Sequence, residues 1–125
     1  MKSIDPRRIR SAIDAAEART SGRIGVRVTD EPSDDTLALA RADFERARLH
    51  EHPAKNAVIF LISPRAKRFA VFGGDAIHAA VGDAFWNDLV AAMTPFFARN
   101  DATAGVVFGI TRVGERLREH FPKES

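Results

Sequence analysis

Apolar residues along this chain follow two different periods. They recur at helical spacing in four segments: Ile9 to Ala16, Leu37 to Ala47, Asp83 to Arg99 and Val106 to Leu117. Asp5 and Pro6 begin the first of these, because an aspartate can accept from orphan helix amides and proline loses no bond at the first helical position. A short helical turn is expected at Ala76 to Val81, after the break Gly73-Gly74.

Three other segments have the patterns of strands. Ile24, Val26 and Val28 alternate with smaller or polar residues, which predicts a strand with only one face buried. Ala57 to Ile62 is apolar without alternation, which is typical of a central strand covered on both faces. Phe69 to Phe72 follows after a polar turn and predicts a third strand in a hairpin with the second.

The element order is therefore α-β-α-β-β-α-α. The first two strands and the helix between them form a βαβ unit, which crosses over right-handed and makes a parallel pair. The third strand then runs antiparallel to the second. Because the central strand is apolar on both faces, helices must cover both, so we expect a three-layer α/β sandwich with a small mixed sheet. A length of 125 residues suits a single domain over residues 1–125.

Composition narrows the classes of function. The chain has no cysteine, which excludes disulfides, thiolate metal sites and cysteine nucleophiles. Its 19 basic and 17 acidic residues are too balanced to predict a nucleic-acid partner. The apolar run Ala57 to Ile62 is far shorter than the roughly 18–20 residues that span a bilayer, and the first residues lack the apolar core of a signal peptide. We expect a soluble, cytoplasmic protein without a transmembrane segment.

Several phrases in this order resemble the TPM-domain family: 15–24 (AAEARTSGRI), 55–62 (KNAVIFLI), 69–75 (FAVFGGD), Phe85-Trp86 and 120–122 (HFP). The resemblance covers nearly the whole chain and implies a Rossmann-like α/β sandwich. It also implies candidate activities, because some plant members are described as weak acid phosphatases and others are associated with calcium or membrane complexes. The chain departs from the usual family pattern at Arg23 and at Lys55-Asn56-Ala57.

A first candidate site follows from the hairpin. If the third strand runs antiparallel to the second, its end lies beside the start of the second, where acidic, amide, imidazole and ammonium groups would meet. A divalent metal or a phosphate is the ligand that such groups suit. The alternative is that these groups organise turns, which short polar side chains do more often. The candidate residues are Asp75, Asn56, His78, Lys55, His50 and His52.

A second candidate lies at the opposite end of the sheet. Asp30, Asp34 and Asp35 follow the first strand, and ligands of open α/β sheets favour the carboxyl ends of parallel strands. Carboxylate oxygens there would hold calcium weakly. The alternative is ordinary capping of the next helix, with Ser33 or Asp34 as the cap.

No set of nucleophile, base and oxyanion donors converges in this sequence, so catalytic residues stay unassigned. The preferred hypothesis is a binding or accessory module, without chemistry of its own, for a protein partner or a membrane-associated complex. The alternative is a weak metal-dependent acid phosphatase that acts on phosphate esters, with Asp75, Asn56 and His78 at the metal and Lys55 binding the anion. A third hypothesis is homo-oligomerisation through the strand edges.

Overall fold

A computed structural model describes residues 4–30 and 35–123 of the chain. Its elements follow the order α1 (Pro6–Glu17), β1 (Arg23–Val28), α2 (Thr36–Arg46), the 3₁₀ turn η1 (Leu49–Glu51), β2 (Ala57–Ser63), β3 (Arg68–Gly73), α3 (Asp75–Ala98) and α4 (Ala102–His120). This is the predicted order, with η1 as an addition. None of the helices in these residues has the length and apolar composition needed to cross a membrane.

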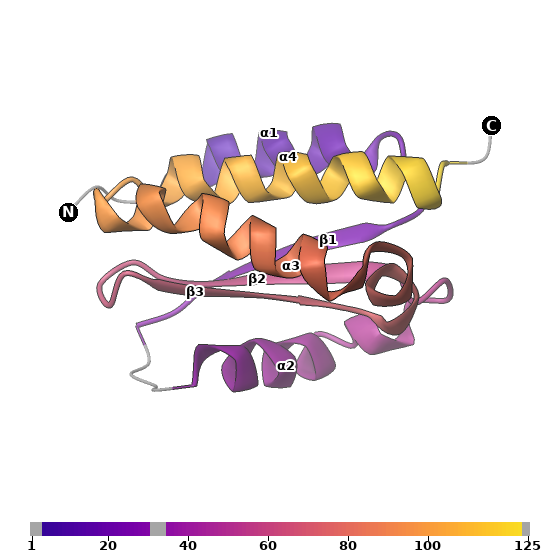
Figure 1. Cartoon of the computed structure of the whole chain (residues 1–125), viewed down its shortest axis with the longest axis horizontal. Helices are drawn as coiled ribbons and strands as arrows, with labels where there is room; N and C mark the ends of the chain where they lie inside the picture. The colour runs from indigo at the N-terminus through magenta and orange to yellow at the C-terminus, as the bar shows by residue number, and fades with distance from the viewer. Residues whose placement is uncertain (1–3, 31–34, 124–125) are drawn as a thin grey trace.

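The sheet has the order β1-β2-β3 and lies between two helical layers (Figure 1). β1 and β2 pair in parallel, with Arg23 opposite Ala57, and β2 and β3 pair antiparallel, with Val58 opposite Gly73. The helices α1, α3 and α4 cover one face, and α2 covers the other (Figure 1). The predicted three-layer α/β sandwich with a mixed sheet is confirmed.

The core is divided by β2. Val58, Phe60 and Ile62 pack among α1, α3 and α4, whereas Ile59 and Leu61 pack on the α2 side. Every residue of β2 is buried, as its unbroken apolar run predicts. The burial of bulky side chains on both faces fixes this strand at the centre of the sheet.

Local sequence signals set most helix ends. Asp5 caps α1 by accepting from the amides of Arg7 and Arg8, and Pro6 is the first helical residue, as predicted. The cap of α2 is Asp35, whose Oδ1 accepts from the amide of Ala38 at 2.9 Å. The sequence had indicated Ser33 or Asp34, which lie outside the described residues.

The predicted short turn and the long third helix are joined in α3. The joint is Gly82, whose φ of 76° and ψ of 170° are not helical. A positive φ is available to glycine at little steric cost, so Gly82 lets the chain change direction between the two predicted helical pieces.

Candidate functional site

The predicted contact between the end of β3 and the start of β2 is present. The amide of Gly74 donates to the carbonyl of Ala57 at 2.8 Å, which extends the hairpin by one bond beyond β3. Lys55 precedes β2 in a left-handed conformation, with a φ of 54°. Its carbonyl accepts from the amide of Ala76 at 3.0 Å and from that of Ile77 at 3.4 Å. This carbonyl therefore satisfies the first amides of α3, which would otherwise be available to an anion.

Gly74 is required at this junction by the space available. A Cβ built on Gly74 would lie 2.7 Å from the carbonyl oxygen of Lys55. The φ of Gly74 is −65°, which any residue adopts, so close approach of the backbone and not torsional freedom explains the glycine.

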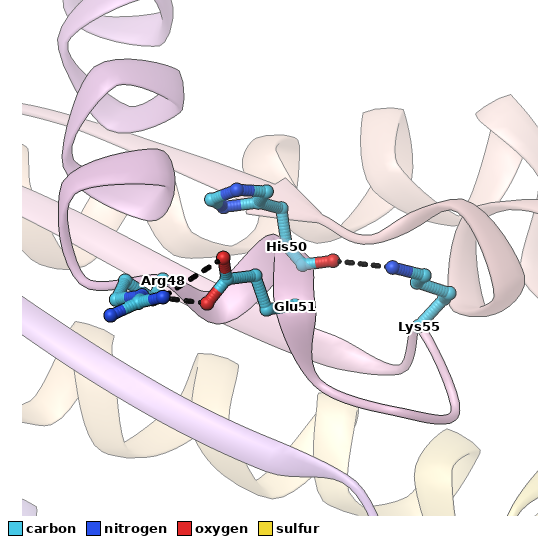
Figure 2. Close-up of polar contacts among 4 residues, drawn as sticks. All are labelled: Arg48, His50, Glu51 and Lys55. Atoms are coloured by element: carbon cyan, nitrogen blue, oxygen red, sulfur yellow. Dashed lines mark hydrogen bonds and ion pairs between the residues drawn. The ribbon is translucent and has the colours of Figure 1, made fainter.

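Three of the predicted site residues line one hollow of about 450 Å³, which we call the hairpin hollow. They are His50, Lys55 and Asp75, and Arg41 and Glu45 of α2 complete its polar lining. The Nζ of Lys55 donates to the carbonyl of His50 at 2.7 Å. Figure 2 shows the imidazole of His50 pointing away from this ammonium group. The hollow thus holds charges of both signs.

The other three predicted residues lie elsewhere. Asn56 is fully buried, and its Nδ2 donates to the Oγ of Ser21 at 3.1 Å. The Nε2 of His52 lies 3.0 Å from the carbonyl oxygen of Ser21. His78 lies on α3, with its Nε2 3.3 Å from the carboxylate of Asp83. Across residues 4–30 and 35–123, no three histidine or carboxylate side chains are close enough to share a metal ion.

The second predicted cluster is only partly described. Asp30 is exposed just beyond β1, Asp35 caps α2, and Asp34 lies outside the described residues. The amide of Thr29 donates to the carbonyl of Ile62 at 2.9 Å, so the carboxyl ends of β1 and β2 do meet as predicted. Asp35 therefore caps the next helix, which is the role that the sequence analysis gave as the alternative to calcium binding.

A larger hollow of about 670 Å³ lies beside β1, and the sequence reasoning did not find it. We call it the arginine groove, because Arg23 and Arg27 of β1, Arg46 of α2 and Arg48 of η1's cap line it. It exists because α2 packs over β2 and β3 and leaves the same face of β1 uncovered. The sequence of β1 did indicate an uncovered face. Arg23, Gly25 and Arg27 lie on one face of this strand, and a strand covered on both faces would carry apolar residues at these positions.

Charges in the arginine groove are only partly compensated. Asp43, which is 8% exposed, accepts from the Nη1 of Arg46 at 2.9 Å and lies 3.8 Å from the Nε of Arg27. Arg48 donates from its Nε to the Oε2 of Glu51 at 2.6 Å (Figure 2).

Arg23 is exposed and has no ion pair within the described residues. Four arginines thus face two carboxylates, and the groove has an excess of positive charge that favours an anionic ligand.

The comparisons with known proteins agree with this fold. The family model described as TPM domain matches residues 2–116. The NMR structure of BA42 protein from the psychrophilic bacterium Bizionia argentinensis is 26% identical, with a TM-score of 0.87 over 99% of this chain and 88% of that one. The N-terminal domain of cg2496 protein from Corynebacterium glutamicum is 18% identical, with a TM-score of 0.71 over 94% of this chain and 74% of that one, and shares the fold. No curated protein matched.

Proposed function

The chain belongs to the TPM domain family, and on that premise we propose that it is a non-catalytic binding module for a protein partner. The observation that carries the proposal is the arginine groove. A module that recognises a partner needs an open surface with unbalanced charge or exposed apolar groups. The groove supplies the first of these with four arginines from three neighbouring segments.

The charge of the groove indicates an acidic partner. Asp43 and Glu51 orient the guanidinium groups of Arg46 and Arg48 without neutralising the groove as a whole. Arg23 adds a positive charge that no described carboxylate compensates. A guanidinium presents several N–H groups, so each of these arginines has donors left over. Carboxylates of an acidic partner would accept hydrogen bonds from them.

Titration with a decameric polyglutamate peptide, followed by amide chemical shifts of the ¹⁵N-labelled chain, tests this proposal. We expect the shifts to concentrate at residues 23–27 and 43–52, and the affinity to fall several-fold when salt rises from about 50 to 300 mM. Arg23→Ala should weaken binding. Arg8→Ala, an exposed arginine on α1 in the opposite layer, is the matched control and should not. Equal losses in the two variants, or no binding at millimolar peptide, would refute the proposal.

The phosphatase hypothesis rests on the hairpin hollow, where Lys55 and Asp75 line one cavity. An ammonium group and a carboxylate that line the same cavity suit a phosphate ester together with a divalent cation. Hydrolysis of p-nitrophenyl phosphate with calcium or zinc present tests it. Turnover that disappears in Asp75→Ala would favour this function over the binding module. Absence of turnover, and of any heat of calcium or zinc binding at millimolar concentration, would remove it.

A further inference from the structure

β1 is an edge strand whose outer side is open beyond Ile24. The amide of Thr29 donates to β2, and hydrogen-bonding direction alternates along a strand, so the backbone groups of Ile24, Val26 and Val28 point away from the sheet. No other strand of the described chain pairs with this edge. Val26 and Val28 have no backbone partner on it within the same residues. An unpaired row of this kind is a template for another strand.

One outward amide of β1 already has a hydrogen-bond partner, which shows that this edge can bind an acceptor from outside the sheet. The amide of Ile24 donates to the Oε2 of Glu17, at the end of α1, at 2.7 Å. A side-chain carboxylate thus already takes the place that a carbonyl of a neighbouring strand would occupy. The remaining outward groups of β1 continue this row towards Val28.

The side chains of β1 specify which strand would fit. Arg23 and Arg27 lie on the groove face, whereas Val26 and Val28 lie on the other, and Val28 is 46% exposed. Because side chains of adjacent strands alternate in step, an added strand would place every second residue beside the arginines and the others beside the valines. A matching segment therefore alternates acidic and apolar residues.

The floor of the arginine groove is formed in part by Gly25 and Leu49. Gly25 lies between the two arginines of β1, and an added Cβ there would make ordinary van der Waals contact with the Cδ1 of Leu49 at 3.5 Å and the Cγ1 of Ile59 at 3.8 Å. No side chain of β1 therefore stands between Arg23 and Arg27. The six residues of β1 extend over about 20 Å, the length of an extended hexapeptide, and Val26 and Val28 carry the outward groups beyond the one that Glu17 already occupies at Ile24.

We propose that the arginine groove binds an acidic, extended peptide segment that adds as a fourth strand to the open edge of β1. This rests on the proposed binding function and names its partner class and its mode. Backbone hydrogen bonds to Val26 and Val28 supply affinity, and the arginines select acidic residues at alternate positions. The partner is a peptide and not a nucleic acid, since only a peptide backbone matches the spacing of donors and acceptors along β1.

The test uses three acetylated and amidated hexapeptides against the ¹⁵N-labelled chain. The first alternates glutamate and valine, the second carries backbone N-methyl groups on the alternate residues that would bond to β1, and the third has the same composition in two blocks. The first peptide should bind, with shifts at residues 24–28. N-methylation should weaken binding about tenfold or more, since two or three hydrogen bonds are lost. The block peptide should bind more weakly than the first.

Arginine variants separate charge from strand addition. Arg23→Ala should weaken the alternating peptide by about 1.5- to 5-fold, as the loss of an exposed ion pair does, and Arg8→Ala should leave it unchanged. If the N-methylated peptide binds as tightly as its parent while Arg23→Ala still weakens both, strand addition is overturned and the anionic binding function stands. If no peptide binds at millimolar concentration, both are overturned. Tighter binding of a single-stranded oligonucleotide of equal charge would overturn the partner class.

Discussion

Replacement of Gly74 by alanine tests the account of the junction between β3 and α3. The added Cβ would lie 2.7 Å from the carbonyl oxygen of Lys55 and 3.1 Å from its carbon, so backbone must move to admit it. That carbonyl accepts two amides of α3, and its displacement weakens both bonds. Overpacking costs about 1–3 kcal/mol and each weakened bond up to about 1 kcal/mol. Together these contributions give about 1–5 kcal/mol, so we expect Gly74→Ala to lower the free energy of unfolding by about 2–4 kcal/mol, the middle of that range.

Urea unfolding followed by the fluorescence of the single tryptophan, Trp86, measures this change, because the chain has no tyrosine. With a denaturant slope of about 1.5 kcal/mol per molar urea, the midpoint should fall by between about 1 and 3 M. Gly25→Ala is the matched control. Its Cβ would meet Leu49 at 3.5 Å and Ile59 at 3.8 Å, both ordinary contacts, so the free energy of unfolding should stay unchanged or rise by up to about 1 kcal/mol.

The comparison of the two glycines decides between causes. If Gly74→Ala unfolds within about 0.5 kcal/mol of the unchanged chain, the Lys55 carbonyl does not confine Gly74 and the reasoning is wrong. If both alanine variants lose stability equally, general sensitivity to the substitution explains the result. Only a large loss confined to Gly74→Ala supports the close approach described above.

Three further predictions concern single polar side chains. Thr20 is 3% exposed, and its Oγ1 accepts from the amide of Gly22 at 3.0 Å, so Thr20→Val should lower the free energy of unfolding by about 1–3 kcal/mol. Thr111→Val, on the exposed surface of α4, is the control and should leave the free energy of unfolding unchanged. Equal losses of stability in the two variants would contradict this prediction. Asp35→Ala removes the cap of α2 and should lower the free energy of unfolding by about 1 kcal/mol in the same urea assay. A change near zero would show that the Asp35 side chain does not stabilise the start of α2. Asp43→Asn removes a negative charge from the arginine groove, so it should tighten binding of the alternating glutamate–valine peptide about twofold or more while lowering the stability of the fold. If the variant stays folded but binds the peptide more weakly, the excess positive charge of the groove does not drive binding.

Local patterns account for the parts of the fold that were predicted. Asp5 and Pro6 begin α1 because capping needs only residues within one helical turn, and the apolar run in β2 requires cover on both faces wherever the strand lies. The hairpin between β2 and β3 likewise follows from two strands with a short polar connection. These features depend on neighbours in sequence, so a single sequence is enough to infer them.

The candidate site was predicted less completely, for a physical reason that Lys55 and Asn56 illustrate. The hairpin brings Lys55 and Asp75 to the same hollow, as antiparallel pairing requires. Asn56, the next residue along the chain, is buried and donates to the Oγ of Ser21 instead. Which way a side chain turns at a strand end depends on the packing around it, and strand order alone does not specify that.

The sequence by itself therefore determined the elements, their order and the mixed sheet, because hydrophobic period, caps and turn residues act over a few positions. Only the tertiary structure decided that α2 lies over β2 and β3 and leaves one face of β1 open. That placement gathers Arg23, Arg27, Arg46 and Arg48 around one groove, although half of them are about twenty positions from the others in the chain. The position of a helix across a sheet depends on how the side chains of the two layers pack together, and hydrophobic periodicity does not specify that packing.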